Sequence, residues 1–219
     1  MLTTSSFAKT ILKLALLLVT FSMAACAVGN KYDLATSAPD MSKKIDTSAA
    51  VGVHDQRSFI LDDDKEPQFI GLQRGGFGNP FDVTTKSGAP LAKDIEDSVV
   101  QGLEKAGIKT SRVVFTHTQT PGQVKDVILG VGADHSLLII VNKWKSDTYT
   151  NTQLTYDLSA FIYGKDGKLL AENRIVGSND LGGDAWNPPA HAEKAVPTAL
   201  SDKLDQLLDT PEILDALSK

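Results

Sequence analysis

The amino-acid sequence predicts an α+β domain in which a mixed, mostly antiparallel sheet carries helices packed on one face. Residues 90–107 and 191–209 repeat apolar residues at helical spacing, whereas residues 151–163 alternate apolar and polar residues as a half-buried strand does. The predicted elements follow one another in the order β-α-β-α-β-β-β-α. This order is typical of a single α+β domain.

The first predicted strand covers residues 49–55, where valines alternate with small residues. The first predicted helix covers residues 90–107. Pro90 suits the first turn of that helix and Gly107 suits its C-terminal cap. The buried face of the helix consists of apolar residues at steps of four, namely Leu91, Ile95, Val99 and Leu103.

The second half of the chain contains the remaining strands and helices. A strand at 108–115 and a helix at 120–133 precede a continuous apolar run at 134–145, which suits a strand covered on both faces. The turn "GKDG" joins the alternating strand at 151–163 to a strand at 168–178. The last helix covers residues 191–209, with Pro197 starting or kinking it, and Thr210 caps a final short turn that has Pro211 in its first position.

The connection 56–89 is long for a compact domain, and such connections are usually functional or mobile. Within it, Phe59–Leu61 and Phe69–Gly71 are predicted to form a short hairpin around the acidic tip Asp62–Asp64. The acidic tip lacks the spacing and the central glycine of a calcium-binding loop, which favours a solvated turn.

The N-terminal residues have the layout of a secretory signal. Lys9 and Lys13 make the start basic, and Leu14–Ala25 contains no charged residue. A transmembrane helix needs about 20 predominantly apolar residues, so this run is too short to span a bilayer.

Cys26 is the only cysteine of the chain and follows the small residues Ala24 and Ala25. The stretch "MAAC" resembles the bacterial lipobox, with Met23 where that pattern prefers leucine, so we expect Cys26 to be lipidated after residues 1–25 are removed. A plain secretory signal and a buried or reactive thiol are the alternatives. Ala27 follows the cysteine where an aspartate would favour the inner membrane, which predicts an outer-membrane protein that faces the periplasm.

Residues 26–47 are polar and show no sustained period, which predicts a flexible tether before a domain at 48–219. The tether could extend to about 70 Å. The alternative is that part of it packs on the domain as an edge strand. Removal of Lys9 and Lys13 with the signal leaves 20 basic and 27 acidic residues, a net charge of −7. This acidic balance argues against nucleic-acid binding.

The sequence contains no convincing catalytic or metal-binding pattern, so we expect no cofactor and no enzymatic activity. The four histidines, His54, His117, His135 and His191, never fall at the spacing of a helical metal pair. Asp134, His135 and Ser136 are consecutive, but a catalytic triad is a spatial arrangement.

The glycine-rich stretch 73–81, "QRGGFGNPF", is the strongest candidate for a ligand or partner loop. Its glycines and Arg74 suit an anion-binding nest, although the lysine and the serine or threonine of a phosphate-binding loop are missing. The alternative is a mobile loop in which Phe77 and Phe81 act as aromatic plugs. Trp186 lies in a second loop, where it either anchors a partner or covers the core.

Several segments together resemble the YajG-like family of small bacterial lipoproteins. They are the lipobox, "VGVHDQR", "QFIGLQRGGFGNP", "QLTYDLSAFIYGKDGKLLAENRIVGS" and "AVPTALSDKLDQLLDTPEILDAL", in that order along the chain. The resemblance implies an envelope lipoprotein and implies no catalytic residue or cofactor.

The sequence therefore predicts a non-enzymatic lipoprotein of the cell envelope whose domain binds a protein or cell-wall partner. An accessory subunit of an envelope transport or secretion system is the first alternative. An enzyme with a pocket at the loop 73–81 is the second.

Overall fold

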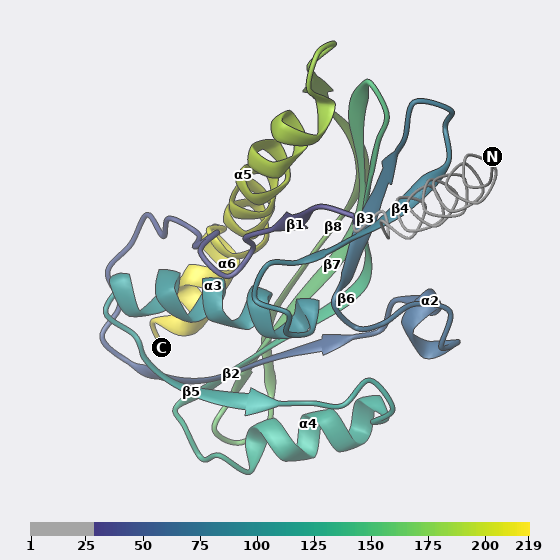
Figure 1. Cartoon of the computed structure of the whole chain (residues 1–219). Coiled ribbons are helices and arrows are strands. Elements are labelled where there is room, and N and C mark those ends of the chain that lie inside the picture. Colours follow the sequence, from purple (N-terminus) through teal and green to yellow (C-terminus); the bar gives the residue numbers. More distant parts are fainter. Residues whose placement is uncertain (1–28) are drawn as a thin grey trace, which may run out of the picture.

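Eight strands form one mixed sheet in residues 29–219, the part of the chain that the computed structural model describes (Figure 1). The strands are β1 (Lys31–Tyr32), β2 (Ser48–Asp55), β3 (Phe69–Arg74), β4 (Pro80–Thr85), β5 (Lys109–Val114), β6 (His135–Thr148), β7 (Asn151–Gly164) and β8 (Leu169–Gly183). The helices of the same residues are α2 (Ser58–Leu61), α3 (Leu91–Lys105), α4 (Pro121–Leu129), α5 (Pro188–Leu208) and α6 (Pro211–Leu217). The α+β class and the mixed sheet expected from the sequence are confirmed.

Local capping signals set the limits of several helices. At α4, the side chain of Thr120 accepts a hydrogen bond from the Gln123 amide, and the Gln123 side chain accepts one from the Thr120 amide, which forms a capping box. Gly107 follows α3 with a φ of 98°, a conformation that favours glycine. The predicted cap at Thr210 is also present. Helix α5 begins at Pro188, earlier than expected, and contains Pro197 in its interior.

The long strand β6 organises the sheet because two different strands share one of its edges. Its first half, His135–Val141, pairs in parallel with β2, and its last residues, Ser146–Thr148, pair in parallel with β3. Strand β7 lies antiparallel along the opposite edge and is followed by β8. The sheet therefore divides into one branch ending in β5 and another that continues through β4 to β1. The two longest ladders, β6–β7 and β7–β8, are antiparallel.

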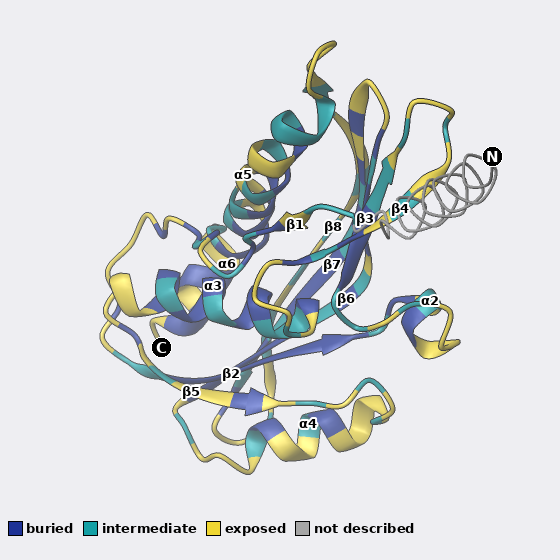
Figure 2. Ribbon diagram, in the orientation of Figure 1, coloured by how far each residue is buried: buried dark blue, intermediate teal, exposed yellow. Residues whose placement is uncertain are grey.

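The helices cover both faces of the sheet, and the expectation that they pack on one face is wrong. Helices α3, α5 and α6 contribute to the main core cluster, which includes Leu137 and Ile139 of β6. Helix α4 lies on the other face, where Val124 and Ile128 pack with Leu138. Figure 1 shows α3 and α4 on opposite sides of β2 and β5. Because β6 buries apolar side chains on both faces, it needs a helix on each side, as its continuous apolar run indicated. Figure 2 accordingly shows β2, its neighbour, buried along its length.

The connection 56–89 is more regular than expected, and the predicted hairpin between Phe59–Leu61 and Phe69–Gly71 is wrong. Phe59–Leu61 belongs to the short helix α2, while Phe69–Arg74 is β3 and pairs with β4. The reason lies in Arg57, which is fully buried and forms a bidentate ion pair with Asp55 at 2.8 and 2.6 Å. Its guanidinium also donates to the carbonyl oxygen of Phe69 at 2.5 Å and thereby brings β3 beside the end of β2.

The expectation of a flexible tether over residues 26–47 is wrong for residues 29–47, which are part of the folded domain. Strand β1 pairs in parallel with β4, and the side chains of Tyr32 and Leu34 are fully buried. The carbonyl oxygen of Leu34 accepts a hydrogen bond of 2.6 Å from the Ser98 hydroxyl on α3. The alternative prediction, that part of this segment packs on the domain as an edge strand, is therefore the correct one. Among the helices of residues 29–219, none combines the length and the apolar character needed to cross a bilayer.

Candidate functional site

Three chain turns meet at one end of the sheet, and we call them the loop end. They are the β3–β4 turn at residues 75–79, the β6–β7 turn at 149–150 and the β8–α5 turn at 184–187. The Tyr149 hydroxyl lies 3.5 Å from the carbonyl oxygen of Gly76, so the first two turns are neighbours. Gly183 packs against Thr150, which places the third turn beside them. Figure 1 shows the three turns together at its upper end.

The structure brings Phe77 and Trp186 to this loop end and exposes both side chains. Phe77 lies in the turn of the β3–β4 hairpin, where Gly78 has a φ of 79° and suits the tight reversal. Trp186 follows Asp184, whose carboxylate accepts hydrogen bonds from the backbone amides of Trp186 (2.8 Å) and Asn187 (3.0 Å). These two bonds lower the pKa of Asp184 and fix the turn that presents the indole ring. The indole ring of Trp186 therefore does not cover the core, and its role as an anchor for a partner stays a prediction.

Arg74 and Phe81 take different roles from those expected. The Arg74 guanidinium forms a bidentate ion pair with Asp147 at 2.8 and 2.6 Å, which raises the pKa of Arg74. Because the charge of Arg74 is already matched, an anion-binding nest at residues 73–81 loses its cation. Phe81 is half-buried on β4, and its ring lies against the backbone of Gly75. Phe81 thus supports the hairpin, whereas the side chain of Phe77 is exposed to solvent.

Tyr149 is a member of the loop end that sequence reasoning missed. Its side chain is exposed in the turn between two predicted strands, a position that gives an aromatic residue no core to join. An aromatic residue in the turn between two predicted strands was the sequence signal that could have identified Tyr149. Asp147, the partner of Arg74, could not be found in this way because 73 residues separate the two.

The four histidines do not gather into a site. The His54 ring bonds the Thr116 carbonyl oxygen at 3.1 Å, and the His135 ring bonds the Thr47 hydroxyl at 3.1 Å. Burial lowers the pKa of both rings, which favours their neutral form. The Ser136 hydroxyl faces the carbonyl oxygen of Ile128 instead of His135, so the tripeptide at 134–136 forms no triad.

The acidic tip Asp62–Asp64 forms no metal site in the described residues. The neighbouring Lys65 pairs with Asp82 at 2.7 Å and so joins the tip to β4. More generally, residues 29–219 contain no group of three or more histidine, cysteine, aspartate or glutamate side chains that could hold a metal ion.

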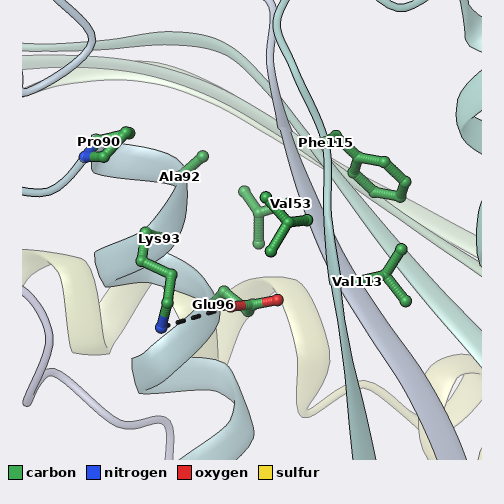
Figure 3. A pocket seen from close by; sticks show the side chains of 8 residues that line it. Val53, Pro90, Ala92, Lys93, Glu96, Val113 and Phe115 are labelled. Atoms are coloured by element: carbon green, nitrogen blue, oxygen red, sulfur yellow. Dashed lines mark ion pairs between the residues drawn. The ribbon is translucent and has the colours of Figure 1, made fainter.

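A small cavity opens where α3 meets β2 and β5 (Figure 3). Its volume of about 60 Å³ is far below the roughly 300–1,000 Å³ of typical ligand pockets. Glu96 forms its polar wall and is nearly buried; one carboxylate oxygen faces Lys93 at 3.5 Å and Arg112 at 3.4 Å. The remaining lining is mostly apolar and comes from Val53, Pro90, Ala92, Val113, Val114 and Phe115. The cavity suits a single inserted side chain better than a substrate.

The expected lipidation site, Cys26, lies outside the described residues 29–219. Gly29, the first described residue, lies directly against the backbone of Asp82 on β4. Cys26 precedes this point by three residues.

No model of a known protein family matches this chain, and no curated protein matches it in sequence. Several solved structures resemble it in outline. A Xanthomonas campestris protein of the family described as DUF330 shares 18% identity over 76% of this chain and 87% of that chain, with a TM-score of 0.45. The PelC dodecamer from Paraburkholderia phytofirmans shares 12% identity over 83% and 93% of the two chains, with a TM-score of 0.38. A lipoprotein from Neisseria meningitidis shares 13% identity over 73% and 99%, with a TM-score of 0.27.

Scores of this size carry no argument about function. The YajG-like resemblance therefore stays an expectation drawn from the sequence.

Proposed function

We propose that this chain is a non-enzymatic lipoprotein of the bacterial cell envelope, anchored through Cys26 to the outer membrane and facing the periplasm. The observation that carries the proposal is the order of the N-terminal residues, in which a basic start, an uncharged apolar run and small residues lead directly to the only cysteine. Stable anchoring requires more than one acyl chain, which bacterial lipoproteins of this pattern characteristically carry.

The proposal also assigns the folded domain a binding role toward a protein or cell-wall partner. Within residues 29–219, β5 pairs with β2 alone, so its outer edge presents backbone groups to which another strand can be added. Val114 at the end of β5 is 77% exposed and borders the cavity that contains Glu96. An extended partner segment at this edge would place a side chain beside that cavity.

The loop 73–81 favours a contact surface over an enzymatic pocket. Phe77 points into solvent and Arg74 is held by Asp147, which supports the non-enzymatic proposal.

The anchor is tested by intact-mass spectrometry, palmitate labelling and membrane fractionation of the wild type and the Cys26→Ala variant. We expect a chain that begins at Cys26, carries acyl groups and stays with the membrane fraction. The variant should lose the label and the membrane association. A wild-type chain that keeps residues 1–25 or fractionates as soluble protein would contradict the anchor.

The binding role is tested by a photo-crosslinking amino acid placed at Val114, with Val127 on α4 as the matched control because its side chain is also exposed. We expect a reproducible envelope partner from position 114 and none from position 127. A partner that spans a membrane would favour the accessory subunit of a transport or secretion system. Equal or absent crosslinks at both positions would count against the β5 edge.

A further inference from the structure

The exposed aromatic side chains of this domain are concentrated at the loop end. Within residues 29–219, the exposed aromatic residues are Phe77, Tyr149 and Trp186, and each lies in one of the three neighbouring turns. Phe77 and Trp186 are more than nine-tenths exposed. Aromatic residues normally contribute large apolar area to cores and interfaces. Three exposed aromatic side chains on adjacent turns therefore indicate a surface that interacts with another apolar surface, either of a membrane or of a protein.

The N-terminal end of β1 faces this same end of the sheet. Strand β1 runs parallel to β4, with Lys31 opposite Thr84, and Gly29 lies against Asp82. A step toward the N-terminus is thus a step toward Pro80, where β4 leaves the β3–β4 turn. Three residue spacings separate Gly29 from Cys26, and three extended spacings reach at most about 11 Å. An acyl group on Cys26 would hold the loop end close to the bilayer.

The charges of the loop end fit a zwitterionic lipid surface. Arg74 is matched by Asp147, and the Asp184 carboxylate is bound to backbone amides of its own turn. The Asp180 carboxylate accepts bonds from Asn151 and from the Gly182 amide. The turns therefore have no excess of basic side chains. Membranes rich in anionic lipid attract such side chains, so the loop end is better suited to zwitterionic lipid.

We propose that the loop end lies in the headgroup region of the membrane that carries the anchor, with Phe77, Tyr149 and Trp186 in contact with lipid. Tryptophan and tyrosine favour this region because it accommodates an apolar ring together with a polar N–H or O–H group, and the phenylalanine ring adds apolar area. The inference rests on the proposed lipid anchor and adds a fixed orientation to it: the domain lies on the membrane through one end instead of extending from it.

Tryptophan fluorescence tests this orientation because the chain has two tryptophans in opposite environments. Trp144 is fully buried, whereas Trp186 is 97% exposed. The full-length lipoprotein is produced in a bacterial host and reconstituted into vesicles of phosphatidylethanolamine and phosphatidylcholine. We expect brominated phosphatidylcholine to remove most of the Trp186 emission, and acrylamide to lose its access to Trp186. The Trp186→Phe variant retains Trp144 alone and should show no loss.

The matched control places a tryptophan at the other end of β8. Leu169 is also exposed, and β8 extends 15 residues, or about 45 Å, from Leu169 to the loop end. In the Trp186→Phe background, Leu169→Trp should remain unaffected by brominated lipid. The emission of buried Trp144 reports whether each variant is folded.

The outcomes separate the orientation from the anchor. A lipidated, vesicle-bound chain whose Trp186 stays open to acrylamide overturns the orientation and leaves the proposed anchor intact; in that case the aromatic turns serve a protein partner. Equal quenching at positions 169 and 186 also overturns it, and so does quenching that requires anionic lipid. A chain without acyl groups on Cys26 overturns the proposed anchor, and the orientation fails with it.

Discussion

Replacing Leu34 by alanine tests whether the segment before β2 belongs to the cooperative fold. Leu34 is fully buried, and its carbonyl oxygen is held by Ser98. The substitution removes three carbon atoms, worth about 0.8 kcal/mol each by transfer, and leaves a cavity that brings typical Leu→Ala losses to about 3–5 kcal/mol. For a chain of this size, 3 kcal/mol corresponds to a fall in Tm of about 6–12 °C.

The assay is thermal and denaturant unfolding followed by circular dichroism, with Thr36→Ala as the matched control. Thr36 lies in the same segment but is exposed, so its replacement should change the free energy of unfolding by less than about 0.5 kcal/mol. If Leu34→Ala is as harmless as Thr36→Ala, residues 29–47 do not contribute to stability and the packed segment is refuted.

Three further predictions concern buried polar groups. Arg57→Met should lower the free energy of unfolding by about 3–5 kcal/mol in denaturant titration, because it leaves the Asp55 carboxylate buried and unpaired; a loss below 1 kcal/mol would contradict this role. Burial raises the pKa of Tyr32 to about 12, so the difference in tyrosinate absorbance between wild type and Tyr32→Phe should develop near pH 12, and stability should fall as pH rises above 10; a midpoint near pH 10 would indicate an exposed ring. Burial lowers the pKa of His54 below 6.5. The contribution of the neutral His54 ring to the free energy of unfolding is therefore complete above pH 6.5, and it is lost as pH falls through the lowered folded-state pKa. Nuclear magnetic resonance titration of the His54 ring checks this, and a normal pKa would contradict it.

The spacing of apolar residues along the sequence predicted the helices and strands in which buried residues recur at regular intervals. The apolar residues of α3 recur at helical spacing because one face of the helix is buried, and β7 alternates because successive side chains point to opposite faces. The cap at Thr210 acts within one turn of helix and was equally visible. Residues 29–47 carry no such period because single residues, Tyr32, Leu34, Met41 and Ile45, enter the core at irregular intervals.

The candidate site likewise contains features that the sequence predicted and features that it did not. Phe77 and Trp186 were visible in the sequence as aromatic residues in turn-rich segments, and both are exposed in the structure. Two other features of the site were not visible in the sequence, namely the ion pair between Arg74 and Asp147 and the position of Tyr149 beside Gly76. Both depend on the parallel pairing of β3 with the end of β6.

The sequence by itself determined the α+β class and most of the helix and strand positions, because these depend on the spacing of neighbouring residues; from the same kind of local pattern it predicts the signal and the anchor in residues 1–26. Only the tertiary structure decided that α4 covers the second face, that residues 29–47 pack on the domain, and that three distant turns meet. Those features depend on which strands share the edges of β6. That choice is made by contacts between residues far apart in the chain, which no local period records.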